Sequence, residues 1–335
     1  MAYTIPEEIA KTVRPGEQKE IERLLLLLTT ASQAEITDFS VMGGGLTNRN
    51  YKVTLSNGKM IAMRIAGQGT DEYLNRAAEK RNAALVSGLG INAEVYFFDL
   101  KTGSQLSHFI NGRTLTPEDF QNDREVLKKT ADIMRKYHTC GQEFADDFGP
   151  LREIRSYFKI LRGSNFSEFY KELEVIKPRL LDVAEAYINC PQKRVPCHND
   201  PLSANFMEEG DRLYLIDWEY AGMNDPTFDL AAIINENCLD DEAAEYFLEC
   251  YYGGELTEEQ RARVHISRFV ADALWAVWSL VQINSGKDHD LYWEYGQDRV
   301  DWCMKFINHP KFEEYLKLIG FVDDGVYPDF GEMLK

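Results

Sequence analysis

The chain has 335 residues, about two domains' worth, and its apolar fraction of 44% suffices for a sizeable core. It holds 37 Lys and Arg against 55 Asp and Glu, a formal net charge of −18. This balance argues against nucleic acid and anionic lipid surfaces as partners, because both are bound mainly through basic side chains. Residues 1–115 hold 13 basic and 12 acidic residues, and residues 116–335 hold 24 and 43. The asymmetry indicates two parts with different partners, or simply an acidic solvated surface on the second.

The compartment is predicted from the cysteines and the N-terminus. None of the six cysteines lies in a CxxC pair, so a zinc site is not expected. The N-terminal residues lack a basic segment followed by an apolar core, and no uninterrupted apolar run approaches the ~20 residues of a membrane span. We therefore expect free thiols in a cytoplasmic protein without stable membrane association.

The first third of the chain predicts one helix and then a sheet. Residues Glu17–Ala34 favour a helix, whose apolar part is Ile21 and the Leu24–Leu28 run. Whether that run docks on the sheet or on a second subunit is left open by the sequence. Alternating and β-branched residues then predict three strands, at Ile36–Met42, Asn50–Leu55 and Met60–Ile65. The Asn57-Gly58 pair predicts a tight hairpin turn between the last two, since both residues accept positive φ angles.

Two more strands and a helical region follow. A helix is expected over 71–87, with Thr70 or Asp71 as its N-cap, and strands over Glu94–Leu100 and Gln105–Ile110. Beyond these strands, helices are expected at roughly 117–139, 150–163, 166–189, 240–252, 257–285 and 288–318. A non-helical island at Val195–Asp229 interrupts them. The pattern predicts an α+β protein with a five-stranded antiparallel lobe at 1–112 and a larger, mainly helical lobe at 113–335.

The island contains the strongest chemical signal. It has the pattern His198-x-Asp200-x4-Asn205, followed by an apolar strand that ends at Asp217. Phosphoryl transfer from a nucleotide needs a carboxylate for the acceptor's proton and oxygen ligands for Mg²⁺. The plainer interpretation is a helix cap, a turn amide and a surface acid. A carboxylate directly after the apolar Tyr214–Ile216 run makes the catalytic interpretation stronger.

Two weaker patterns support it. The loop Gly43–Asn48 lies between the first two strands, where small residues would let backbone N–H groups approach phosphates. Most glycine triplets are only flexible turns. Trp275 and Trp278 lie three residues apart on one helix face, with Tyr292, Trp293 and Tyr295 on the next segment. Such aromatics either pack in a core or surround a cation, since aromatic faces attract quaternary ammonium groups.

These patterns together resemble the protein-kinase-like phosphotransferases and, within them, the choline/ethanolamine kinase family, in particular its bacterial choline kinases of the phosphorylcholine-incorporation type. The similarity extends over about residues 36–305. It rests on five segments: 44–51, 64–73, 198–205, 216–231 and 275–279.

The resemblance implies catalytic and nucleotide-binding roles. Asp200 would be the base that orients and deprotonates the alcohol, and Asn205 and Asp217 would be the Mg²⁺ ligands. His198 and Asp229 would brace the catalytic loop. The residues expected at ATP are the loop residues Gly44, Gly45, Thr47 and Asn48, the pair Arg64 and Glu79, and the hinge residues Ser107, Phe109 and Ile110.

The resemblance also implies an acceptor pocket made of Tyr220, Trp275, Trp278 and Tyr295, with Tyr292 and Trp293 having a weaker claim. The position two after the base is Leu202, where animal choline kinases have a polar residue, so the pocket rim is not settled by similarity. The expected protein is an ATP- and Mg²⁺-dependent kinase that converts choline to phosphocholine. The alternatives are a kinase for ethanolamine, thiamine or another small alcohol, and a silent pseudokinase. The sequence leaves monomer and homodimer open.

Overall fold

The computed structural model describes residues 5–322, except residues 6, 12 and 15 and the segments 44–47 and 68–73. The chain forms two compact units. The first comprises Met1–Leu115, Phe144–Asp146 and Ala204–Ala221, and the second Thr116–Glu143, Asp147–Ser203 and Gly222–Lys335. The expected α+β fold is confirmed, with a five-stranded antiparallel sheet in the first unit and a helix-rich second unit.

The sheet of the first unit has the strand order β1-β2-β3-β5-β4. Its strands are β1 (Ile36–Met42), β2 (Arg49–Leu55), β3 (Met60–Ile65), β4 (Val95–Phe98) and β5 (Gln105–His108). A hairpin joins β2 and β3 as predicted, with Leu55 N–H donating to Lys59 O at 2.9 Å. Its turn is not of the predicted primed type, because Gly58 has a positive φ, 82°, and Asn57 does not. The expected N-cap at Thr70 or Asp71 lies outside the described residues. Helix α3 (Arg76–Gly88) begins later, at a cap where Asn75 accepts from Ala78 N–H.

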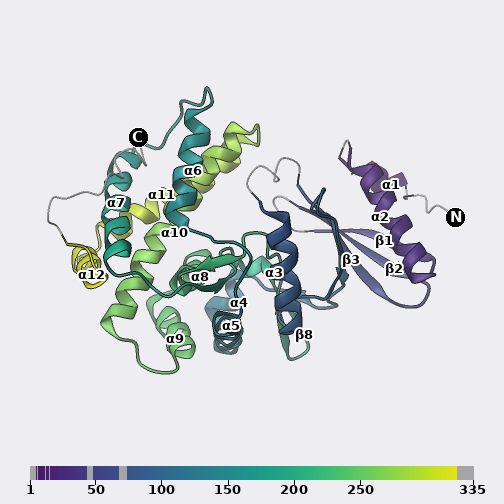
Figure 1. Cartoon of the computed structure of the whole chain (residues 1–335), viewed down its shortest axis with the longest axis horizontal. Coiled ribbons are helices and arrows are strands. Elements are labelled where there is room, and N and C mark those ends of the chain that lie inside the picture. Colours follow the sequence, from purple (N-terminus) through teal and green to yellow (C-terminus); the bar gives the residue numbers. More distant parts are fainter. Residues whose placement is uncertain are drawn as a thin grey trace. The chain divides into compact units, whose positions relative to one another are not determined.

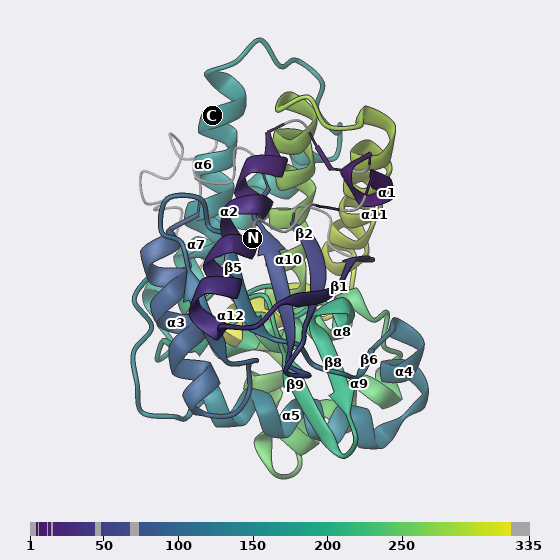
Figure 2. The same cartoon turned by 90° about the vertical axis from the view of Figure 1, so that its right-hand side faces the viewer.

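The leucine run of helix α2 (Glu17–Ser32) packs on the sheet of its own chain. Its buried side chains Ile21, Leu24, Leu25 and Leu28 pack against alternate residues of β1, β2 and β3 in a single apolar cluster. Arg23 binds Asp99 at 2.6 Å, which fastens the helix to the turn after β4. The short helix α1 (Glu7–Ala10) precedes it. Within this unit α2 lies on one side of the sheet and α3 on the other (Figures 1 and 2).

A second, three-stranded sheet of the first unit has the order β6-β8-β9 and consists of β6 (Arg113–Thr114), β8 (Phe206–Glu209) and β9 (Arg212–Leu215). Leu215 N–H donates to Ile91 O at 3.0 Å, and Tyr214 packs on Ala93 and Ile110. The sequence placed one boundary near residue 112 and this hairpin beyond it. Backbone pairing with β6 and with Ile91 instead groups residues 204–221 with the first unit, so neither unit is a continuous stretch of chain.

The second unit consists mainly of helices: α4 (Pro117–Asn122), α5 (Arg124–His138), α6 (Pro150–Arg162), α7 (Leu173–Asn189), α8 (Pro226–Glu236), α9 (Asp241–Tyr252), α10 (Glu258–Asn284), α11 (His289–Ile307) and α12 (Phe312–Leu318). Strands β7 (Val195–Cys197) and β10 (Gly222–Asn224) pair beside them. Two expected helices are each divided in two. Asp123 leaves helical geometry to cap α5, and Pro310 lies in the break between α11 and α12. The expected island also ends earlier, because Asp225 caps α8 ahead of Pro226.

Helix α10 is the core of the second unit and packs against α6, α8, α11 and α12. It is long and apolar enough to cross a membrane by length and composition alone. However, 89% of its most apolar 18-residue window is buried inside the structure, as in the core helix of a globular domain. The six cysteines are all free thiols, as expected.

The docking of α2 predicts different costs for two neighbouring leucines. Leu24 is fully buried against the sheet, whereas Leu26 on the same helix is 57% exposed. We expect Leu24→Ala to lower the free energy of unfolding by about 2–4 kcal/mol, through lost burial and an unfilled cavity. Leu26→Ala should change it by less than about 0.5 kcal/mol. Urea unfolding of both variants measures this, and equal losses would contradict the packing of α2 on the sheet.

Candidate active site

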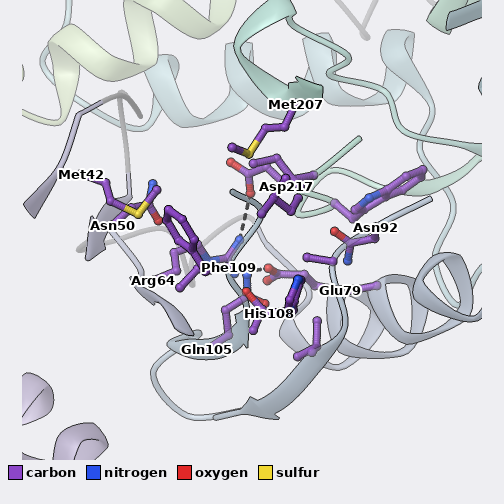
Figure 3. A pocket seen from close by; sticks show the side chains of 18 residues that line it. Met42, Asn50, Arg64, Glu79, Asn92, Gln105, His108, Phe109, Met207 and Asp217 are labelled. Carbon is purple, nitrogen blue, oxygen red and sulfur yellow. Dashed lines mark hydrogen bonds and ion pairs between the residues drawn. The ribbon is translucent and has the colours of Figure 1, made fainter. Parts of the chain in front are cut away.

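A pocket of about 780 Å³ opens in the first unit beside β3 and β5 (Figure 3). Five predicted residues line it: Arg64, Glu79, Ser107, Phe109 and Ile110. The β8–β9 hairpin and its end contribute Met207, Ile216 and Asp217. Its mainly apolar walls with a few charged groups at one side are typical of a small-molecule site.

The other predicted nucleotide residues have different positions. Gly44, Gly45 and Thr47 lie outside the described residues. Asn48 is buried, and its side chain accepts from Gly67 N–H at 3.2 Å and donates to Glu219 at 3.2 Å. It therefore anchors the end of the glycine loop to the segment after Asp217. The sequence reasoning missed the lining residues Asn50, Gln105 and Met207, although strand alternation could have indicated the first two.

A buried guanidinium organises one end of this pocket. Arg64 binds Asp217 at 2.8 Å, Glu79 through a short contact, and Gly103 O at 3.2 Å. In the same network, Arg76 binds Glu79 at 2.8 Å. The predicted Arg64–Glu79 pair is thus present, but Arg76 was missed, and only its position three residues before Glu79 hinted at it. Burial opposes the charge of Arg64, yet Glu79, Asp217 and Glu219 outweigh it and raise its pKa.

A third acid, Glu219, belongs to this network. It lies 3.7 Å from Arg76 and accepts a hydrogen bond from Asn48. Burial, together with the negative charge of Asp217, raises the pKa of Glu219 to about 7. The side chain of Arg76 packs against Gly103. A Cβ at this position would lie only 2.6 Å from the Arg76 side chain, so a larger residue would not fit without a shift. Glu219 lies in the segment 216–231, on which the family resemblance rests, but no site role was expected for it.

Asn205 and Asp217 come together across the end of the β8–β9 hairpin. Ile216 N–H donates to Asn205 O at 2.9 Å, which continues the pairing of Phe206 with Leu215. Asp217 has a φ of 66°, a conformation that is costly without glycine and that often occurs where function demands it. The apolar strand expected before Asp217 is β9. An amide and a carboxylate oxygen are donors that Mg²⁺ prefers.

Asp200 lies in the second unit, on a loop held by one buried carboxylate. Asp229 accepts from His198 N–H at 2.8 Å and from Asn199 N–H at 2.7 Å, one bond to each oxygen. His198 Nδ1 in turn accepts from Asp200 N–H at 3.2 Å. Asn199 has a φ of 68° and is fixed by a 2.9 Å bond from Asn224. The loop therefore has the bracing expected of His198 and Asp229, and the side chain of Asp200 remains partly exposed.

A group with metal-ligand chemistry lies behind this loop. His138, Cys197 and Asp229 bring one ligand atom each within 4.8 Å of one another. Asp229 also accepts from Tyr137 Oη at 2.6 Å and lies 3.1 Å from His138 Nε2. Burial would raise the pKa of Asp229, but the bonds from His138 and Tyr137 lower it. Because both of its oxygens already hold the loop and burial raises the pKa of the Cys197 thiol, we interpret the group as structural.

The predicted acceptor aromatics form a contiguous cluster in the second unit. The rings of Trp275 and Trp278 lie 5.7 Å apart at 87°, and Trp278 lies 5.7 Å from Tyr292 and 6.1 Å from Tyr295. Within the described part of the chain, the buried indole Nε1 of Trp278 has no hydrogen-bond partner. Tyr220 belongs to the first unit, where it is half-buried. Tyr292 is thus a full member of the cluster, despite its weaker claim from the sequence.

A buried ionic group that the sequence reasoning missed supports this aromatic cluster. Arg299 lies 4.8 Å from the centre of the Tyr295 ring, binds Glu236 at 2.8 Å and Asp272 at 3.2 Å. Burial, followed by the charges of Glu236 and Asp200 among others, raises the pKa of Tyr295. Tyr295 and Asp200 belong to the same unit. The only signal in the sequence was the four-residue spacing of Tyr295 and Arg299 on one helix.

The sheet with its pocket, the Arg64 network and the braced Asp200 loop define a phosphotransferase of the protein-kinase-like fold. A model described as choline/ethanolamine kinase matches residues 39–272. The chain is 32% identical over 273 residues to protein LicA of Haemophilus influenzae, which covers 79% of this chain and 78% of LicA.

Solved structures of proteins from the same family are also similar to this chain. A choline/ethanolamine kinase family protein from Mesorhizobium loti matches with a TM-score of 0.79 and 28% identity, over 90% of this chain and 98% of that one. Choline kinase LicA from Streptococcus pneumoniae matches with a TM-score of 0.73 and 28% identity, over 86% and 99%. The chain therefore belongs to the choline/ethanolamine kinase family. Its activity is phosphoryl transfer to an alcohol.

The Arg299 group predicts a pH-dependent stability. Burial raises the pKa of Asp272 to about 7, although Arg299 opposes the rise. Between about pH 4 and pH 7 the folded state then keeps a proton that the unfolded chain releases, because an unperturbed Asp titrates near pH ~3.9. The free energy of unfolding should therefore fall as pH rises through this window, by up to about 1.4 kcal/mol per pH unit, and level off above it.

The variant Asp272→Asn cannot bind this proton, so its free energy of unfolding should lack the decrease that Asp272 causes. From pH 4 to pH 7 the wild type should therefore lose stability relative to the variant. Asp298→Asn, at an exposed position on α11, is the control. Urea unfolding at four pH values measures both. Parallel pH profiles for wild type and Asp272→Asn would contradict the raised pKa.

Proposed function

We propose that this protein is an ATP- and Mg²⁺-dependent choline kinase that transfers the γ-phosphoryl group of ATP to the choline hydroxyl. The observation on which this rests is an aromatic cluster in the same unit as Asp200, made of Trp275, Trp278, Tyr292 and Tyr295. Aromatic faces bind quaternary ammonium groups through their quadrupole, and a nearby carboxylate would serve the hydroxyl at the other end of the same small molecule.

The acids near the cluster favour choline over ethanolamine. A primary ammonium offers three N–H donors and needs hydrogen-bond acceptors, whereas a trimethylammonium offers none. Glu236 and Asp272, the acids close to Tyr295, are already bound by Arg299. The charge of Glu236 still attracts a cation, but the engaged oxygens of both acids would make poor acceptors for an ammonium group. The similarity to choline kinase LicA from Streptococcus pneumoniae also supports choline as the acceptor.

The proposed chemistry uses residues of both units in separate roles. Asp200 orients the alcohol and accepts its proton as the oxygen bonds to the γ-phosphorus and ADP departs. Asn205 and Asp217 would hold Mg²⁺, whose charge neutralises the phosphates when it is bound. Their fit rests on the donor set, a hard amide and carboxylate pair on one hairpin end. Arg64, fixed by Glu79, supplies a permanent cation beside the nucleotide pocket.

Asp200→Asn tests the base. Removing the proton acceptor should lower kcat by about 10²–10⁴-fold, while ATP affinity measured by calorimetry stays near wild type. Asp211→Asn, in the exposed turn of the β8–β9 hairpin, is the control and should keep full activity. Near-normal turnover of Asp200→Asn on choline would exclude Asp200 as the base.

Trp278→Ala tests the cation pocket. Loss of one aromatic face should raise the KM for choline by about 10–30-fold and change the KM for ATP by less than about twofold. Trp278→Phe keeps an aromatic face and should recover most of the affinity. Trp302→Ala, at a partly exposed position on α11, is the control. An unchanged choline KM would return Trp278 to a packing role.

Substrate choice is measured with a panel of choline, ethanolamine and thiamine, followed by ADP release. The proposal expects the highest kcat/KM for choline. A preference for ethanolamine would overturn the choline assignment and leave the alcohol phosphotransferase intact.

A further inference from the structure

Helix α11 has a buried glycine in its interior, on the helix that packs most extensively against α10. Gly296 directly follows Tyr295 of the aromatic cluster. Glycine is unfavourable inside a helix, because it loses more backbone freedom on folding than any other residue. A Cβ at this position would lie 2.1 Å from Ser279 Oγ and 2.1 Å from Tyr170 Oη. Two hydroxyl groups therefore occupy the space that a methyl group at residue 296 would need.

These two hydroxyls form a buried polar contact that joins three segments of the second unit. Tyr170 Oη lies 2.9 Å from Ser279 Oγ of α10 and 3.2 Å from Trp293 O of α11. Ser279 Oγ also donates to Ala276 O at 2.8 Å. Tyr170 and Ser279 are 2% and 0% exposed. Moving either hydroxyl away would leave a buried polar group unpaired, so the contact holds α10 and α11 at a fixed spacing.

Packing also restrains the ring of Tyr170. It lies 4.5 Å from the ring of Trp293, which stacks on His289 at 5.7 Å. Trp293, which had only a weaker claim to the acceptor pocket, thus packs on Tyr170. Ordinary contacts of a carbon atom are about 3.5–4.0 Å, so a methyl group at residue 296 would require a shift of roughly 1.5 Å. Because the phenol is restrained, we expect α11 to move away from α10.

The contact lies beside the aromatic faces of the proposed acceptor site. Ser279 directly follows Trp278 in α10, as Gly296 follows Tyr295 in α11, and the rings of Trp278 and Tyr295 lie 6.1 Å apart. Among the described residues, the buried indole Nε1 of Trp278 has no hydrogen-bond partner. Packing of the helices, rather than a hydrogen bond, therefore sets the position of this ring. A change in the spacing of α10 and α11 would change the gap between the two rings.

We propose that Gly296, with Ser279 and Tyr170, is a positioning group that sets the spacing of Trp278 and Tyr295 and thereby the size of the ammonium group that the site accepts. This inference rests on the proposed choline site. A cation is attracted to an aromatic face when it lies within about 6 Å of the ring centre. Rings on two helices can both satisfy this condition only at a spacing that matches the cation. The present spacing suits a trimethylammonium group, and a wider one would favour a larger alkylammonium group.

The variant Gly296→Ala tests this by adding one methyl group. It should raise the KM for choline about tenfold and change kcat and the KM for ATP by less than about threefold, as expected for lost binding of one substrate. The ratio of kcat/KM for the N-triethyl analogue of choline to kcat/KM for choline should rise about tenfold. Gly254→Ala is the control, in an exposed turn where a Cβ would meet nothing within 4 Å, and should leave the ratio unchanged.

A compensating variant separates spacing from general damage. Tyr170→Phe and Ser279→Ala, added to Gly296→Ala, remove both oxygens that the new methyl group would meet. The closest approach to Tyr170 is then 2.9 Å, to Cζ, which requires a smaller shift. The choline KM should return to within about threefold of the wild-type value, and the ratio should fall with it.

Tyr170→Phe alone shortens the spacer and keeps the proposal testable where Gly296→Ala does not fold. It should lower the same ratio by about two- to threefold, opposite in direction to Gly296→Ala. An unchanged ratio in either single variant, or a raised choline KM that the compensating variant does not restore, would overturn the proposal. Turnover of choline by the wild type tests the proposed function separately, so its failure and a failure of the spacing inference are distinguishable.

Discussion

The first unit depends on one buried guanidinium. Arg64 binds the acids Glu79 of α3 and Asp217 at the end of the β8–β9 hairpin, which lie 15 and 153 residues from it in sequence. A buried cation with one partner removed would leave an uncompensated charge, so each contact depends on the others. This explains why residues 204–221 belong with the N-terminal sheet. It also places a fixed positive charge in the wall of the pocket that the nucleotide is proposed to occupy.

The second unit also depends on a buried charged group, in this case a carboxylate. Asp229 is fully buried, and its two oxygens accept from the successive amides of His198 and Asn199. Those bonds stabilise a left-handed conformation at Asn199 that would otherwise be costly. The same bonds fix the backbone from which the next side chain, Asp200, extends. In both units the candidate catalytic residues lie on strained or tightly bonded backbone, and a buried ion contacts that backbone or its side chain.

Much of the secondary structure could be predicted from the sequence, because it depends on patterns of a few neighbouring residues. Strands β1 and β3 have the predicted bounds, since alternation and the Asn57-Gly58 turn act over a few residues. The apolar run that ends at Asp217 likewise forms the strand β9 of a local hairpin, whose two ends carry Asn205 and Asp217. Errors arose where a local signal was overlooked or outweighed: Asp123 and Pro310 interrupt long helical patterns, and Asp225-Pro226 starts a helix inside the expected island.

The fold class and the family resemblance could thus be predicted from the amino-acid sequence, and so could a set of candidate catalytic residues, because each depends on spacing along the chain. The partners of these side chains became known only from the folded structure. Arg76 and Glu219 join the Arg64 network, and Arg299 supports Tyr295, through contacts that spacing alone did not select. The reason is physical: many acids could pair with a given arginine, and burial of the whole group selects the arrangement that leaves no charge without a partner.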